Sequence, residues 1–280
     1  QSHTHSDLVA PAFIEFTGQG EEADDLAELL RAMGFARTHV AGKVELWRQG
    51  EAVIALNRME EGLAHSIYLL QGLSVSGIGL QVDDLDQMDQ RLGLFHGEDA
   101  TLDGPSPYGL RVVRGPGGSV FYLAGGPIES APGFARFEPT GEQPAGHVLR
   151  IDHCAQALQP NLFLSGLMFY RAVFNMRSEE ARDVLDPHGT VHSRTLANDD
   201  GQVRLSLNSS FGAGTTTQRF LEKSGFAPWH HIAFHSDDIF AFAQTMEPFD
   251  VLQVPANYYE DLACRFDLDA GLIEQMKALN

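Results

Sequence analysis

The amino-acid sequence predicts an α+β protein made of two tandem βαβββ modules, each with a cup-shaped sheet. Strand-like stretches alternate with amphipathic helices, and the order of these elements occurs twice along the chain. The same landmark, a strand running into two aspartates, stands as "SGIGLQVDDL" at residues 76–85 and as "HHIAFHSDDI" at residues 230–239. We therefore expect an N-terminal module over residues 8–139 and a C-terminal module over residues 147–280.

The first copy opens with "PAFIEFTG" at residues 11–18, a run typical of a strand. Apolar residues then recur at helical spacing over residues 21–35. The strands "KVELWRQG" and "EAVIALN" follow, and after a loop the strand at residues 74–85 closes the unit. A short helix and a hairpin complete the copy, with "GPGG" at residues 115–118 as the turn. This stretch does not match the glycine patterns of phosphate-binding loops, which favours the turn over a phosphate cradle.

The second copy repeats this order after the glycine-containing boundary "TGEQPAG" at residues 140–146. We expect a strand at 148–158, a helix at 162–176 and two strands joined by an Asp-Asp-Gly turn at 191–210, before the landmark strand. Each sheet should bury one face against its helix and turn the other face toward a central cavity.

Composition excludes several function classes. The 280 residues include 19 basic and 38 acidic side chains, a net charge of −19, which repels nucleic acid and anionic lipid. We find no apolar run of the roughly 20 residues that a membrane span needs. Two cysteines are too few for a disulfide framework, so we expect a cytoplasmic protein. A homo-oligomer is compatible with all of these features.

The first seven residues, "QSHTHSD", hold two histidines in an H-x-H spacing that could bind a metal. We favour a tag remnant or an interdomain linker as the interpretation. The absence of an initial Met predicts that the chain is a piece of a longer polypeptide.

Two histidines occupy matched strands in the second copy only. His153 lies in the first strand, where the first copy has Phe16, and His231 lies in the landmark strand, where the first copy has Gly77 or a neighbour. Two imidazoles with a carboxylate suit a non-haem iron(II) site that keeps open positions. Core histidines bonded to the backbone are the alternative, but the matched register favours ligation. His235 shares the face of His231, either in the cavity or at its rim.

Two other features admit a chemical and a structural interpretation. The aspartate pairs at 83–84 and 237–238 could form a carboxylate site, but their repetition at a strand–helix junction favours helix capping. Cys154 could be a nucleophile, but strand alternation turns it away from the face of His153, which favours packing.

Several motifs carry a family resemblance that extends over nearly the whole chain: "RIDHC", "FYRAVFNM", "HSRTL", "VRLSLN", "HHIAFHSDDI" and "VPANYYEDLACRFDLD" at residues 254–269. With them the sequence resembles the vicinal-oxygen-chelate (glyoxalase/bleomycin-resistance-like) superfamily, and within it the 4-hydroxyphenylpyruvate dioxygenases. The resemblance implies that His153 and His231 bind Fe(II) or another divalent metal. It places Ser193, Asn208 and Gln218 in the substrate pocket.

The sequence departs from this family at two points. The dioxygenases usually have Gln before the second ligand histidine, where this chain has His230, which we also assign to the substrate pocket. Their third ligand, a glutamate on a later strand, is expected beyond Asn280. Glu260 and Asp261 are the nearest acidic candidates, but their helical context makes them poor substitutes.

A more particular resemblance rests on "HHIAF", "PAFIEF" and "DPHGTVHSR" at residues 186–194. It is to the dioxygenase-like C-terminal half of bacterial fusion proteins whose other half is a 3-dehydroshikimate dehydratase barrel of quinate and shikimate catabolism. The resemblance implies a fused lyase domain as partner and Fe(II)-dependent oxidation of a small 2-oxo acid or related carboxylate. The competing expectation is a catalytically silent structural, assembly or ligand-binding module that supports the dehydratase.

Overall fold

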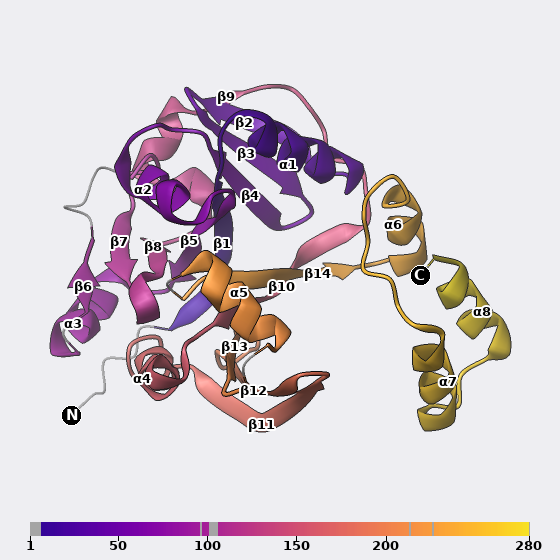
Figure 1. Ribbon diagram of the computed structural model, residues 1–280. Coiled ribbons are helices and arrows are strands. Elements are labelled where there is room, and N and C mark those ends of the chain that lie inside the picture. The colour runs from indigo at the N-terminus through magenta and orange to yellow at the C-terminus, as the bar shows by residue number, and fades with distance from the viewer. Residues whose placement is uncertain (1–6, 96, 101–105, 213, 226, 280) are drawn as a thin grey trace.

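A computed structural model describes residues 7–95, 97–100, 106–212, 214–225 and 227–279 (Figure 1). Helices and two curved sheets are mixed along the chain, which confirms the α+β prediction. The histidines of the H-x-H spacing at residues 3–5 lie outside the described residues.

The N-terminal sheet has nine described strands in the spatial order β6-β7-β8-β5-β1-β4-β3-β2-β9. Their bounds are β1 Leu8–Thr17, β2 Ala36–Ala41, β3 Val44–Gln49, β4 Ala52–Asn57, β5 Ser74–Val82, β6 Glu98–Asp99, β7 Arg111–Arg114, β8 Val120–Ala124 and β9 Glu138–Pro139. The helices of this part are α1 Gly20–Ala32, α2 Gly62–Gln71 and α3 Leu85–Leu94. The "GPGG" stretch forms the turn between β7 and β8, where Gly115 N donates to Ser119 O at 2.7 Å, as predicted.

The repeating unit is shorter than the sequence predicts. β5 does not close the first unit but opens a second one, because it pairs antiparallel with β1 and is followed by its own helix, α3. The N-terminal sheet therefore contains two units, β1-α1-β2-β3-β4 and β5-α3-β6-β7-β8. The stretch between β4 and β5, expected to be a loop, contains α2.

The C-terminal sheet has five described strands in the order β11-β12-β13-β10-β14. Their bounds are β10 Val148–Ala157, β11 Arg177–Asp186, β12 Gly189–Ala197, β13 Arg204–Ser210 and β14 Trp229–Ser236. The helices are α4 Pro160–Ala172, α5 Thr216–Ser224, α6 Ile239–Thr245, α7 Ala256–Arg265 and α8 Ala270–Leu279. No described strand pairs with the second edge of β14.

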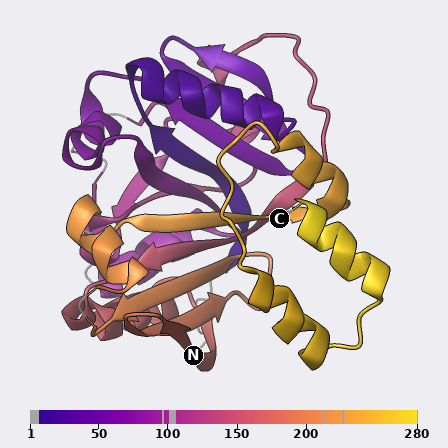
Figure 2. The same cartoon turned by 45° about the vertical axis from the view of Figure 1, so that its right-hand side comes forward.

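Helix α4 ends before residue 176, the predicted end of this helix. Val173 is its C-cap, and the left-handed backbone of Asn175, with φ of 52°, turns the chain toward β11. The predicted helix in "YYEDLACRF" is confirmed as α7, and α7 and α8 stand to one side of the C-terminal sheet (Figure 2).

One apolar core joins the two modules. It contains residues of α1, β1 and β5 from the first module and of α4, β10 and β13 from the second. Phe121 of β8 lies at its centre, with ring centroids 5.1 Å from Phe174 and 5.8 Å from Trp229. These edge-to-face contacts fix the C-terminal sheet against the N-terminal module.

The second aspartate of each pair caps a helix, as predicted. Asp84 accepts from Gln87 N at 3.0 Å at the start of α3, and Asp238 accepts from Ala241 N at 2.9 Å at the start of α6. In the described part of the chain, no helix combines the length and apolar character that crossing a membrane requires.

Candidate metal centre

The strand register places the predicted histidines on one face of the C-terminal sheet. His153 lies opposite Ala233, and His231 lies opposite Ala155 on the neighbouring strand. The residues between them along each strand, Cys154 and Ile232, point into the shared core. His153 and His231 therefore share the concave face, the face that does not pack against α4.

The two rings lie edge to face with centroids 5.5 Å apart. His153 is half-buried, whereas His231 is accessible to solvent. Partial burial lowers the pKa of His231 below its ordinary value, and the neighbouring imidazoles of His230 and His153 lower it further. The neutral imidazole that results is the form that binds metals.

Each histidine is contacted at Nδ1 by the side chain that precedes it. Asp152 Oδ2 lies 2.7 Å from His153 Nδ1, and this hydrogen bond is the main cause that lowers the pKa of Asp152. His230 Nδ1 lies 3.1 Å from His231 Nδ1. The His230 ring also packs edge to face on Phe220 of α5, at 4.7 Å, and its burial lowers its pKa.

Ser193 and Asn208 lie opposite one another on β12 and β13, on the same face as the histidines. Ser206 joins them, because its hydroxyl contacts Ser193 Oγ at 3.1 Å and donates to Asn208 Oδ1 at 3.4 Å. Ser206 also lies opposite Ala155, one strand away from His231. The structure thus adds Ser206 to the predicted polar set; the strand pairing that brings it there is not visible in the sequence.

Gln218 lies apart from this polar set. It is in α5, where its backbone N–H donates to the Thr215 hydroxyl and its side-chain amide donates to Glu222 Oε1 at 3.1 Å. These contacts hold Gln218 along its own helix. Its assignment to the substrate pocket remains a prediction.

The other candidate residues from the sequence are Cys154, Glu260, Asp261 and His235. Cys154 is buried in the shared core, where burial raises the pKa of its thiol to about 12, so the packing interpretation is confirmed. Glu260 and Asp261 lie on α7, where Asp261 pairs with Arg265 at 2.8 Å. His235 is exposed near the end of β14.

The N-terminal module shows which of its residues correspond to the histidines. Phe13 lies opposite Gly79 as His153 lies opposite Ala233, so the counterpart of His153 is Phe13 and the predicted match to Phe16 is wrong. The counterpart of His231 is Gly77, as expected, because Gly77 lies opposite Glu15 as His231 lies opposite Ala155.

Aromatic rings fill the corresponding space in the N-terminal module. Phe13 stacks on Tyr122 at 5.5 Å, and a Cβ atom added to Gly77 would lie 2.6 Å from the Tyr122 ring. The space that the two histidines occupy in the C-terminal module is thus filled here by aromatic rings.

A buried carboxylate completes this packing. Glu15 is fully buried, and its two oxygens accept hydrogen bonds from four side chains: Asn57 at 2.9 Å, Tyr108 at 2.8 Å, Ser76 at 2.7 Å and Tyr122 at 2.7 Å. Glu15 cannot be recognised from the sequence, because these partners come from distant segments. Burial and the Glu15 carboxylate together raise the pKa of both tyrosines well above its usual value.

The donor set of the C-terminal face fits part of a metal site. Two imidazoles engaged at Nδ1 keep Nε2 for an ion, and metal–nitrogen bonds of about 2.0–2.1 Å suit rings at this spacing. Within the described residues, no third His, Cys, Asp or Glu joins them in an arrangement that would hold an ion. The histidine pair therefore fits a divalent metal as two ligands of a larger set.

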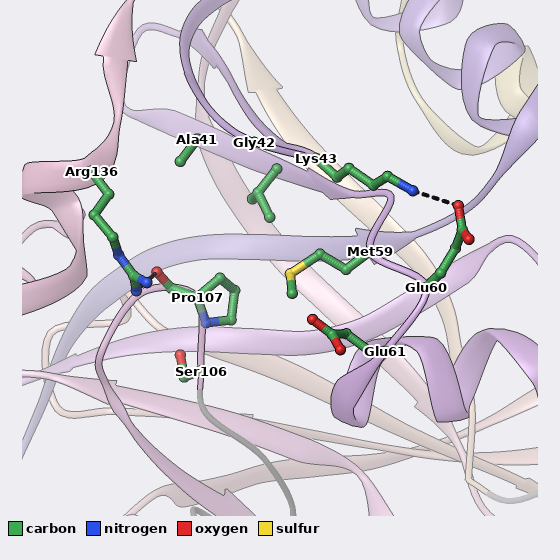
Figure 3. A pocket seen from close by; sticks show the side chains of 10 residues that line it. Ala41, Gly42, Lys43, Met59, Glu60, Glu61, Ser106, Pro107 and Arg136 are labelled. Atoms are coloured by element: carbon green, nitrogen blue, oxygen red, sulfur yellow. Dashed lines mark hydrogen bonds and ion pairs between the residues drawn. The ribbon is translucent and has the colours of Figure 1, made fainter.

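A separate cavity of about 680 Å³ opens in the N-terminal module (Figure 3). Lys43, Met59, Glu61, Ser106 and Arg136 contribute to its lining. The Lys43 ammonium is paired with Glu60 rather than directed at the cavity. This cavity lies in the first module and does not include the histidine pair.

Comparison with known proteins agrees with the fold. Residues 7–126 match the family described as the N-terminal domain of hydroxyphenylpyruvate dioxygenase. A solved structure, a xylose isomerase-like TIM barrel/4-hydroxyphenylpyruvate dioxygenase fusion protein, superposes with a TM-score of 0.81 at 30% identity, over 98% of this chain and 44% of that one. The chain is similar to the 4-hydroxyphenylpyruvate dioxygenases and has their vicinal-oxygen-chelate fold.

Two curated relatives extend the comparison. A 3-dehydroshikimate dehydratase of Pseudomonas putida is 31% identical over 96% of this chain and 43% of its own length. A 4-hydroxyphenylpyruvate dioxygenase of Pseudomonas sp. is 27% identical over 97% of this chain and 79% of its own length. The dioxygenase-like chain thus spans less than half of the dehydratase that it matches.

Proposed function

We propose that the C-terminal module binds Fe(II), or another divalent metal, through His153 and His231 and accepts a small 2-oxo acid or related carboxylate. The observation that carries this proposal is the pair of imidazoles on the concave face, at positions that hold Phe13 and Gly77 in the other module. The similarity to 4-hydroxyphenylpyruvate dioxygenases supports the same assignment.

The third protein ligand, a glutamate, is proposed to come from residues beyond Asn280. No strand in the described part of the chain pairs with the outer edge of β14, and this supports the proposal because its counterpart β5 pairs with β8 on the corresponding side. A strand added to β14 in the same way would lie directly beside His231. Glu260 and Asp261 do not fill this role, since they are on α7 and Asp261 is paired with Arg265.

The residues of the concave face have distinct proposed tasks. His153 and His231 hold the metal, which when bound supplies a Lewis acid and a template for oxidation of the acid. Ser193, Ser206 and Asn208 present hydroxyl and amide groups beside it, suited to orient a carboxylate by hydrogen bonds. His230 stands where the dioxygenases usually have Gln and would contact the substrate from the side of α5.

The second candidate is a catalytically silent module that supports a fused 3-dehydroshikimate dehydratase. The similarity to 3-dehydroshikimate dehydratases more than twice as long as this chain favours it. Under this candidate the lyase activity would reside in a part of the polypeptide outside residues 1–280.

Iron content and oxygen uptake separate the two candidates. The intact protein is loaded with Fe(II) without oxygen, freed of unbound metal and assayed with 4-hydroxyphenylpyruvate, with His153→Ala as the control. Stoichiometric iron and uptake that both disappear in the control support the proposal. Bound iron without uptake overturns the dioxygenase activity on this substrate, and absence of stoichiometric iron favours the silent module.

A further inference from the structure

Three register shifts interrupt the pairing of β10 with β14, and two of them are β-bulges at the residues that precede the histidines. Along β10 the register advances from Ile151–Phe234 to His153–Ala233, which leaves Asp152 as the extra residue. Along β14 it advances from Ala155–His231 to Gln156–Trp229, which leaves His230 as the extra residue.

A bulge changes where a side chain points. Neighbouring residues in a regular strand point to opposite faces, so their side chains do not normally meet. A bulge turns the extra residue out of this alternation and is used next to functional sites to aim a side chain. This explains why Asp152 reaches His153 Nδ1 at 2.7 Å and His230 reaches His231 Nδ1 at 3.1 Å.

The N-terminal module has the same bulges with different side chains. Three register shifts also lie between β1 and β5, and the two that correspond to these bulges leave Ala12 and Ser76 as the extra residues. Ala12 has no polar group to offer, and Ser76 donates to Glu15 instead. The bulges therefore belong to the fold, whereas the polar contacts to imidazole belong to the C-terminal module alone.

Asp152 constrains the proton on His153. An ionised carboxylate only accepts hydrogen bonds, so the short contact places a proton on His153 Nδ1, and in the neutral ring Nε2 then carries the lone pair. Arg150 and Arg204 lie about the same carboxylate, with N···O distances of 4.0 and 3.9 Å, and favour its charged form.

His230 contacts His231 at the same ring nitrogen, Nδ1. Between two neutral imidazoles in contact through Nδ1, one nitrogen donates and the other accepts. If His231 is the donor, its Nε2 also keeps a lone pair, and both histidines then offer the same nitrogen to one ion.

We infer that Asp152 and His230 are positioning residues, which two β-bulges aim at Nδ1 of His153 and His231 so that Nε2 of both rings is the unprotonated, metal-binding nitrogen. The inference rests on the proposed function, because these tautomers have a purpose only if the two histidines bind a metal. Its physical content, the tautomer of each ring, concerns the metal-free protein and can be tested without it.

Long-range ¹H–¹⁵N correlation spectra of the metal-free protein test the inference directly. The ring signals are assigned by their loss in His153→Ala and His231→Ala. We expect both rings as the Nδ1–H tautomer. A predominant Nε2–H tautomer at either histidine would overturn the inference for the corresponding pair.

Paired variants show whether the preceding side chain is the cause. Asp152→Asn keeps an oxygen that accepts from Nδ1–H and should keep the tautomer of His153, whereas Asp152→Leu should lose the preference. His230→Gln and His230→Leu form the same comparison for His231. Unchanged tautomers in the folded Leu variants would refute the inference, and Asn and Gln variants that lose the tautomer would refute it as well.

Zinc affinity supplies a second measurement. Removing a group that orients a metal-bound histidine typically lowers affinity about 10- to 100-fold. We expect a loss of this size for Asp152→Leu and a much smaller loss for Asp152→Asn. Expected tautomers in a protein that binds no metal would leave the inference intact and contradict the proposed function. Metal binding by a protein whose rings carry the proton on Nε2 would contradict the inference and leave the proposed function intact.

Discussion

Replacement of Glu15 by alanine is expected to destabilise the N-terminal module strongly. The side chain is fully buried and accepts four hydrogen bonds, so alanine leaves four buried donors without this acceptor. An unsatisfied buried donor costs about 1–3 kcal/mol. Because the three hydroxyl groups can bond to one another, we take the lower value for each donor and expect a loss of about 4 kcal/mol in the free energy of unfolding.

Glu15→Gln is the informative partner variant. Its amide oxygen keeps the bonds from Asn57 and Tyr108, and its amide nitrogen can donate to the hydroxyl oxygens of Ser76 and Tyr122. The charge and the acceptor for these two hydroxyl protons are lost, but each side chain keeps a hydrogen-bond partner, so we expect a smaller destabilisation, about 1–2 kcal/mol.

Urea unfolding monitored by the fluorescence of the two tryptophans measures both variants. Glu274→Ala, at a carboxylate 73% exposed, serves as the control and should change stability by less than about 0.5 kcal/mol. A Glu15→Ala protein as stable as the control, or no less stable than Glu15→Gln, would refute this account of the buried carboxylate.

Three further predictions concern packing, capping and pH. Cys264 should react with a thiol reagent in the folded protein and Cys154 only after unfolding, because burial raises the pKa of Cys154 to about 12; equal rates would contradict this. Asp238→Ala should cost about 1 kcal/mol in denaturant unfolding through loss of the α6 cap, and an unchanged midpoint would argue against that cap. Stability should fall as pH rises above about 10, because burial raises the pKa of Tyr108 and Tyr122 and the folded state favours their protonated forms; phenolate absorbance from either residue in the folded protein at that pH would contradict this.

Local sequence patterns predicted individual strands and helices better than they predicted how these elements group into repeating units. Alternation identified β5 as a strand, but whether it closes one unit or opens the next depends on its pairing with β1. The run "GLAHSIYLLQ" at 62–71 is apolar almost throughout, so its periodicity does not distinguish a helix from a loop or a buried strand.

The histidine pair could be predicted because a comparison of the two copies of the repeat shows histidine on two matched strands in the second copy only. Its register could not, because aligning Ile14-Glu15 with Ile151-Asp152 by residue type shifts the comparison by three positions relative to the strand pairing. The bulges, the Ser206 bridge and the Glu15 cluster depend on pairing between distant segments. In the Glu15 cluster the hydrogen-bond partners Ser76 and Tyr122 are 61 and 107 residues away along the chain.

The central claim is that His153 and His231 hold one divalent metal ion together. Its most direct test is the stoichiometry of Fe(II) bound, without oxygen, by the intact protein and by three single variants. His235→Ala is the matched control, since His235 lies on the same strand and is exposed. We predict one ion in the natural protein and in His235→Ala, and loss of stoichiometric binding in both His153→Ala and His231→Ala. Retention of one ion in both of these variants would contradict the claim.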